Sequence, residues 1–405
     1  MLQRLRQTTS GHPRPFWLLF WGTLINASGS SMVWPFLTIY LRQRLDIPLT
    51  TVALLLTANS AAGIAATTVT GPAVDRFGRK IAMLLSLGMS ATVMLGMSTA
   101  STVGLWLVLM VAFGGFGRLY RVGVDAMVAD LIPPDRRAGA YALLRMISNL
   151  GIAIGPSVGG FIAAASYQIA FYLAATANLI FAGLMLVSIR ETAPSRADSF
   201  QPQAEAGYGP VLRDRPFLAF CSVYTLASMT YSLLMVLLPV YAKENFGVPE
   251  NQYGFIMATN AAMVVVLQYS VTRRTTRHPQ LPVLAVGSLF YALGVGSVAA
   301  GRSFPTFLGS MVILTIGELI MIPTSTALTA NLAPPEMRGR YMGLYSLTWS
   351  VGFGIGPVLG GYLNDHVAPA AIWYFGLALG LGAAAGFLLL QSGLQRKSQA
   401  TVTPP

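Results

Sequence analysis

The chain has 405 residues, of which 54% are hydrophobic and only 10% charged, and its formal net charge is +12. A soluble globular domain carries about 25% charged residues, so this chain could not cover a water-facing surface and is expected to be a polytopic helical membrane protein. The single cysteine excludes an intramolecular disulfide and a cysteine metal site.

Long apolar runs separated by short polar connectors predict twelve membrane-spanning helices. The polar stretch 190–214, rich in Pro, Ala and charge, separates the sixth from the seventh. We therefore expect an all-α integral membrane protein with two six-helix bundles, residues 1–189 and 215–405, joined by a cytoplasmic linker. The predicted spans are roughly 16–41, 49–74, 80–99, 103–131, 139–165, 168–188, 215–244, 250–272, 281–300, 304–333, 338–363 and 370–392.

The basic residues are distributed unevenly among the connectors. With the N-terminus inside, 19 of the 26 Lys and Arg residues lie on the cytoplasmic side, 4 in outer loops and 3 inside spans. This bias predicts a multi-pass protein of the inner (plasma) membrane with both termini in the cytoplasm. The basic charge is therefore a topology signal, and we expect the lipid bilayer, not nucleic acid, as a partner.

The two halves of the chain repeat each other. Residues 126–162 align without a gap to residues 327–363 at an offset of 201, and the same offset relates Asn59 to Asn260 and Tyr40 to Tyr241. In a chain this apolar, a duplicated half is typical of a secondary transporter.

A charged motif occupies the connection between the second and third spans, from Gly71 to Lys80. Its glycines permit a tight connection, and Asp75 could accept hydrogen bonds from the exposed amides of a neighbouring helix N-terminus. Such a cluster would form a cytoplasmic gate, and the alternative is that the charges are solvated topology anchors. The expected gate residues are Gly71, Asp75, Arg76, Gly78, Arg79 and Asp130.

Glycine recurs every fourth residue in the fifth and eleventh spans. Each stripe is a smooth helix face that a second helix can approach closely, and the prolines add a bend. The stripes could form a rocking interface between the halves or serve ordinary tight packing. The motif residues are Gly151, Gly155, Pro156 and Gly159 in the first copy, and Gly352, Gly356, Pro357 and Gly360 in the second.

Residues 71–80, GPAVDRFGRK, resemble the loop 2–3 signature of the major facilitator superfamily, and residues 151–160, GIAIGPSVGG, resemble its fifth-helix antiporter motif. The resemblance covers essentially the whole chain and is greatest to the twelve-span drug:proton antiporter branch. It implies that two bundles rock around a central cavity lined by spans one, four, seven and ten. It also implies that Asp75 caps the eleventh span, and that the glycine motif denotes antiport.

Charges inside the spans indicate where coupling could occur. Arg118, Arg121 and Asp125 share one face of the fourth span, and Arg118 lies roughly 18 Å deep by helix rise. A buried Arg is costly, so these cavity charge partners should face water or an acid. Glu318 is the only deep acid of the second half, and its repeat equivalent is Gly117.

Under the resemblance, Glu318 and the span-four arginines would face each other across the cavity. We expect Glu318 to be the main proton-coupling group and Asp125 the second, and the alternative is a permanent ion pair. The chain departs from the family pattern in the fourth span, where Met110 lies at roughly the position of the family's usual arginine. The second copy of the loop signature has also decayed to residues 272–277.

The substrate cavity is expected to be apolar and adaptable, because the chain has 18 Met and many aromatic residues. Each candidate could instead pack helices or contact lipid. The candidates are Asn26, Trp34, Phe116, Tyr120, Tyr231, Met235 and Met321.

These observations predict a secondary transporter that exports small amphipathic compounds in exchange for protons. The alternative within transport is a proton-coupled or facilitative carrier of a specific metabolite or lipid, such as a sugar, amino acid or lysolipid. An enzyme is disfavoured because no span carries a nucleophile–base set or metal cluster, and an ATP-driven pump because no phosphate-binding loop occurs. A transporter-like sensor would bind without counterflow. We expect no cofactor or metal, and a monomer.

Overall fold

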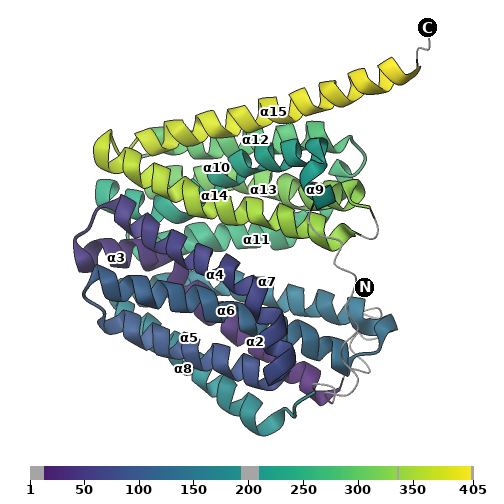
Figure 1. Ribbon diagram of the computed structural model, residues 1–405. Coiled ribbons are helices and arrows are strands. Elements are labelled where there is room, and N and C mark those ends of the chain that lie inside the picture. Colours follow the sequence, from purple (N-terminus) through teal and green to yellow (C-terminus); the bar gives the residue numbers. More distant parts are fainter. Residues whose placement is uncertain (1–12, 193–208, 335–336, 403–405) are drawn as a thin grey trace. The chain divides into compact units, whose positions relative to one another are not determined.

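The computed structural model describes residues 13–192, 209–334 and 337–402 (Figure 1). The described residues form helices and connecting turns, without β-strands. They divide into two compact units, Met1–Asp46 with Ala58–Gln201, and Ile47–Thr57 with Pro202–Pro405. The predicted linker lies largely outside the described residues. The sequence did not indicate that Ile47–Thr57 would group with the second unit.

The first unit contains the helices of the first half of the chain, and one of them, α4, starts in the second unit. A single residue, Gly78, separates α4 from α5, and its φ of 95° is a conformation that favours glycine. The elements are α2 (Arg14–Val33), the 3-10 turn η1 (Trp34–Phe36), α3 (Leu37–Leu45), α4 (Leu49–Phe77), α5 (Arg79–Thr99), α6 (Val103–Leu131), α7 (Pro134–Ala165) and α8 (Tyr167–Ser188).

The second unit contains the helices of the second half. Helix α10 is the most deeply buried of the candidate spans in this unit, and it packs against both α14 and α15. The elements are α9 (Gly209–Arg213), α10 (Arg215–Phe246), α11 (Glu250–Thr275), α12 (Gln280–Ser297), the 3-10 turn η2 (Val298–Ala300), α13 (Phe304–Leu332), α14 (Arg338–His366) and α15 (Ala371–Val402).

Helices cover every predicted span, since a backbone in lipid must satisfy its hydrogen bonds internally. Among the described residues, ten helices are long and apolar enough to cross a membrane. The first predicted span is not one continuous α-helix. It changes to a 3-10 turn at Trp34–Phe36, where Pro35 supplies no backbone N–H.

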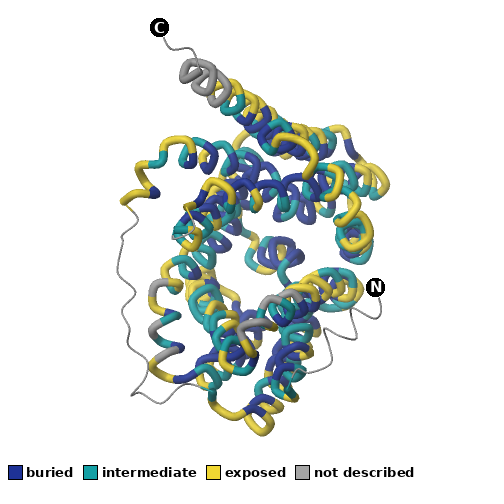
Figure 2. Tube along the Cα trace, turned by 90° about the vertical axis from the view of Figure 1, so that its right-hand side faces the viewer, coloured by how far each residue is buried: buried dark blue, intermediate teal, exposed yellow. Residues whose placement is uncertain are grey.

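The packing of the two units repeats as the sequence does. Helix α2 contacts α7 and α8 as α10 contacts α14 and α15, and α5 contacts α6 and α8 as α12 contacts α13 and α15. Buried and exposed residues alternate along the helices of both units (Figure 2). Equivalent pairs of helices therefore pack together in the two units.

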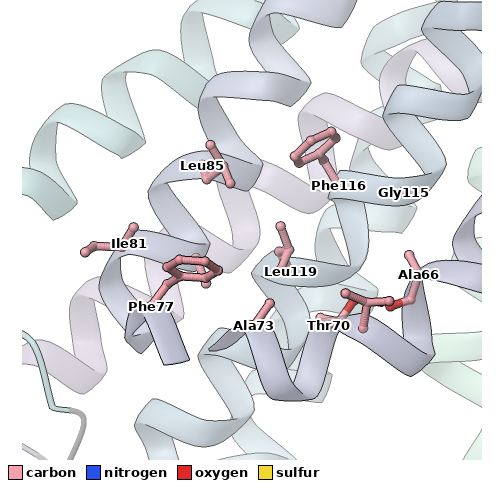
Figure 3. Close-up of a pocket in the computed structure, with 11 residues that line it drawn as sticks. Ala66, Thr70, Ala73, Phe77, Ile81, Leu85, Gly115, Phe116 and Leu119 are labelled. Atoms are coloured by element: carbon pink, nitrogen blue, oxygen red, sulfur yellow. The ribbon is translucent and has the colours of Figure 1, made fainter. Parts of the chain in front are cut away.

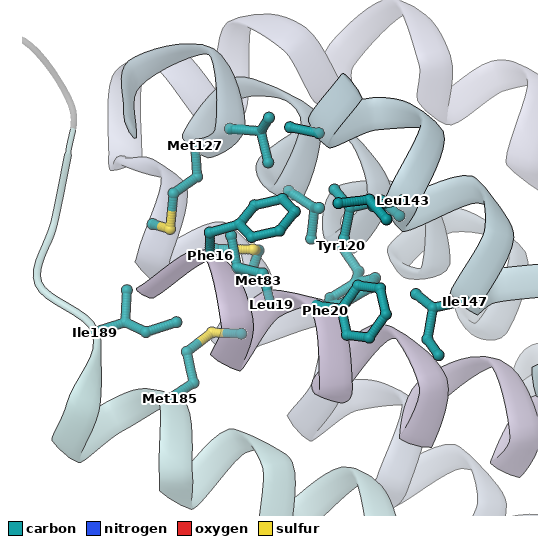
Figure 4. Close-up of a cluster of buried hydrophobic side chains, with 14 of the residues drawn as sticks. Phe16, Leu19, Phe20, Met83, Tyr120, Met127, Leu143, Ile147, Met185 and Ile189 are labelled. Atoms are coloured by element: carbon teal, nitrogen blue, oxygen red, sulfur yellow. The ribbon is translucent and has the colours of Figure 1, made fainter. Parts of the chain in front are cut away.

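The first unit has a core of aliphatic, aromatic and Met side chains between α2, α5, α6, α7 and α8 (Figure 4). Phe16, Met83 and Met127 are fully buried there. Complete burial of such side chains stabilises close helix contacts through dispersion, so this cluster fixes the positions of the helices that carry the charged residues of α6.

Candidate functional site

Glu318 lies on α13 of the second unit, next to α11 and α10. Asn260 Nδ2 of α11 donates to Glu318 Oε2 at 2.7 Å and to Thr315 Oγ1 at 2.9 Å. The Tyr231 hydroxyl of α10 lies close to the Glu318 carboxylate. Both partners are neutral, so the carboxylate can gain or lose a proton without breaking a fixed ion pair in this unit.

Aromatic rings of α14 and α12 surround Tyr231. Its ring lies 5.6 Å from Trp349, 6.0 Å from Phe353 and 5.4 Å from Tyr291, measured between ring centroids. Tyr231, Trp349 and Phe353 are half-buried. An acid beside accessible aromatic faces is an arrangement that attracts organic cations.

The sequence did not identify Asn260 as a partner of Glu318, although the repeat contained a signal. Asn260 corresponds to Asn59, and Asn59 Nδ2 donates to the Met110 carbonyl of α6 at 3.1 Å. The two asparagines make the same helix-to-helix connection in the two units. Only the second one reaches an acid, because the counterpart of Glu318 is Gly117.

The charged residues of α6 belong to the first unit. Arg118, Arg121 and Asp125 are all exposed, and Arg121 is the charged neighbour of the Asp125 carboxylate. The Arg118 guanidinium lies against Gly63 of α4, where an added Cβ would be 3.4 Å from its Nε. The structure describes these groups within their own unit, so their pairing with Glu318 stays a prediction.

The remaining cavity candidates lie in different surroundings. Tyr120 is buried in the core of Figure 4, bonded to Thr23 at 3.1 Å. Met321 is fully buried between α13 and α12, where Ser288 donates to its sulfur. Asn26 donates to Asn178 at 3.2 Å, and Trp34 stacks on Phe113 at 6.3 Å. Met235 is half-buried on α10. Tyr120 and Met321 are thus buried between helices of their own units, and a substrate cavity lined by these candidates stays a prediction.

Phe116 lines an apolar groove of about 350 Å³ among α4, α5 and α6 of the first unit (Figure 3). The groove is lined by aliphatic and aromatic side chains such as Ile81, Leu85 and Leu119, and Thr70 is the one hydroxyl residue among the described residues that line it. Such a lining suits an acyl chain or another apolar molecule and offers no group for proton coupling.

The loop signature forms a polar cluster at the junction of α4 and α5. Arg79 Nε donates to Asp130 Oδ2 at 3.1 Å, and the Arg76 guanidinium lies over the Phe77 ring at 5.7 Å. Gly71 has open space around it, so its glycine is not required by packing there. The side chain of Asp75 is outside those that the structure describes.

Two residues of the linker, Glu191 and Thr192, complete this cluster, and neither was predicted from the sequence. The Glu191 carboxylate accepts from the backbone amides of Arg79 at 2.9 Å and Lys80 at 3.0 Å. These amides begin α5 and have no partner within the helix. The Thr192 hydroxyl donates to Asp130 Oδ2 at 3.0 Å. The start of the linker is therefore fixed to the loop signature.

The two glycine stripes pack against helices of their own units. A Cβ on Gly151 or Gly159 would collide with α2, and one on Gly352 or Gly356 with α10. Ser31 Oγ donates to the Gly151 carbonyl at 3.1 Å, and its repeat equivalent Ser232 donates to Gly352 at 2.9 Å. Close packing within each unit accounts for the stripes, and a rocking role stays a prediction.

Comparison with known proteins shows which family this fold belongs to. The family model described as Major Facilitator Superfamily matches residues 19–227 and 220–404. The chain is 28% identical over 361 residues to the Na(+), Li(+), K(+)/H(+) antiporter of Planococcus maritimus, covering 81% of this chain and 84% of that one. It is 26% identical over 333 residues to the multidrug resistance protein MdtH of Aeromonas salmonicida, covering 81% and 82%.

Solved structures share the fold at low sequence identity. The peptide transporter POT in complex with sulfate has a TM-score of 0.77 at 17% identity, and the match covers 96% of both chains. The family match and the curated relatives, which are transporters, define a multi-pass membrane transporter and not an enzyme. The chain belongs to the Major Facilitator Superfamily.

Proposed function

We propose that this protein exports small amphipathic compounds, organic cations in particular, in exchange for protons. It would act by alternating access in the inner membrane, with both termini in the cytoplasm. Glu318 would bind either the proton or the cation. The observation that carries this proposal is the Glu318 carboxylate, which accepts a hydrogen bond from the neutral Asn260 and lies beside Tyr231, whose ring contacts the half-buried Trp349.

Two further observations support an antiport mechanism. The relatives include a multidrug resistance protein and a cation/proton antiporter. Glu318 lies beside Tyr231, whose ring contacts Trp349 and Phe353, so a cation held on these rings and a proton would compete for the Glu318 carboxylate. Competition for one site couples the two movements without any further group.

The test is transport of a fluorescent lipophilic cation in proteoliposomes with an imposed pH gradient of either sign. We expect the wild type to move the dye against the proton flux and Glu318→Gln to lose this movement. The variant should retain its folded fraction, because Gln occupies nearly the same volume. The matched control is Glu244→Gln, an exposed acid at the end of α10, which should transport normally.

Normal gradient-driven transport by Glu318→Gln would overturn the role of this residue. If neither protein moves the dye, the exposed Arg118 and Arg121 make an anionic metabolite or lipid the next substrate class to assay. That result would reject multidrug export and favour the alternative function, transport of a specific compound.

A further inference from the structure

The first turn of α4 is capped by an acid from α14. Asp365 Oδ1 accepts from the Leu49 amide at 3.2 Å, and Oδ2 accepts from the Thr50 amide at 2.8 Å and the Thr50 hydroxyl at 2.7 Å. The first amides of a helix have no partner within it, and the helix dipole favours an anion there. One carboxylate thus satisfies three donors of α4, and the Asn364 side chain donates to its Oδ1 as well, at 3.1 Å.

Two more contacts hold the same segment of α4 along α14. A Cβ on Gly361 would lie 2.8 Å from the Thr50 nitrogen, so only glycine permits this approach. Two turns further along α4, the Thr57 hydroxyl donates to the Gly354 carbonyl at 2.6 Å. These contacts explain why Ile47–Thr57 groups with the second unit while the remainder of α4 belongs to the first.

We propose that Asp365 is a latch residue that holds the outer end of α4 against α14 and must release it once in each transport cycle. The proposal rests on the proposed alternating-access function and on the predicted orientation, which places the start of α4 and the end of α14 at the outer surface. Alternating access requires this end to open, and a helix continuous between the units cannot move with one of them while its first turn stays capped by the other. The capping bonds are therefore the contacts that opening must break.

The latch can be tested without substrate or gradient, so the result does not depend on which compound is transported. Spin labels at the exposed positions Gln43 and Val367, in a Cys221→Ser background, report the separation of the outer helix ends in nanodiscs. Asp365→Ala should raise the ratio of long-distance to short-distance populations about two- to thirtyfold, the range that loss of a helix cap produces. Thr50→Val removes one donor and should shift the ratio in the same direction by less.

The matched control is Asp46→Asn, which removes an exposed acid three residues before α4 and keeps a residue type that tolerates its φ of 51°. It should leave the distances unchanged. Unchanged distances in both Asp365→Ala and Thr50→Val would overturn the proposal, as would an equal shift in Asp46→Asn, which would assign the effect to surface charge. If Asp365→Ala does not fold, Asp365→Asn and Thr50→Val carry the same test. A shift in distance with no proton-coupled transport would retain the latch and reject the proposed function.

Discussion

Glu318 has two neutral neighbours, Asn260 and Tyr231. Under the proposed function, they would leave its carboxylate able to bind either a proton or a cation. Asn260 and Tyr231 reach it from two different helices, so its position depends on the packing of α10, α11 and α13. Hydrogen bonds to a charged group contribute about 1.5–3 kcal/mol each. Losing one donor should therefore alter the binding of cation and proton at Glu318 without unfolding the protein.

Asn260→Ala should lower gradient-driven transport about tenfold, because one hydrogen bond to the Glu318 carboxylate is lost. The rate is measured in proteoliposomes at a fixed pH gradient and divided by the amount of folded protein. Asn59→Ala is the control, since the equivalent residue of the first unit bonds only a backbone carbonyl. Equal losses in the two variants would show that Asn260 acts through helix packing alone.

At the scale of the helices, the glycine stripes determine how closely α7 and α14 approach their neighbours. Gly159 makes the closest backbone approach of the first stripe, because its added Cβ would collide with the Met32 carbonyl oxygen. A backbone oxygen in a packed helix cannot move aside as a side chain can. The stripes therefore set helix separation in each unit before any function is considered.

Gly159→Ala should destabilise the protein by about 1–3 kcal/mol, the usual cost of overpacking. Gly183→Ala on α8 is the control, because no atom lies within 4 Å of its added Cβ, and alanine favours a helix. Thermal unfolding in detergent should show a lower midpoint for the first variant only. Similar midpoints would mean that α2 and α7 separate readily at this position.

The length of the apolar runs predicted the helices, and the fixed offset predicted the duplication. The role of Glu318, inferred from its charge within a span, stays a prediction. The sequence did not predict that the stripes pack against α2 and α10, because the spacing of glycines describes one face and not its partner. It also contained no sign of Glu191 or Asp365, which lie in a connector and at a helix end, where their contacts depend on chain geometry. Tyr120 and Met321 are buried packing residues because aromatic and Met side chains fill cores as readily as cavities.

For the molecule as a whole, α4 is the element that belongs to both units. Its first turn is capped by Asp365, and the resemblance assigns the corresponding role near its last turn to Asp75. Burial raises the pKa of Asp365, but the hydrogen bonds from Thr50, Asn364 and the Leu49 amide lower it by more. The net result is a pKa below the ordinary value. The charged carboxylate, which makes the cap, is thus the favoured form in the folded protein.

The sign of this shift predicts a pH dependence for the latch. Stabilisation by the cap is complete above the ordinary pKa of an aspartate, about 3.9, and is lost as the pH falls through the lowered value. The distance distribution between labels at Gln43 and Val367 should therefore stay constant from about pH 8 to pH 5 and change only in stronger acid. A transition centred near pH 6.5, the ordinary pKa of histidine, would contradict control by Asp365.

At this position of the repeat only the second unit has an acid, because Gly117 of the first unit corresponds to Glu318. A cycle that exchanges one proton for one singly charged cation at that carboxylate moves no net charge across the bilayer. The membrane voltage, which supplies about 2.3 kcal/mol per elementary charge at 100 mV, then does no work on the exchange. Only the difference in proton concentration would drive export of monovalent cations, whereas a divalent cation would have to leave against the voltage as well.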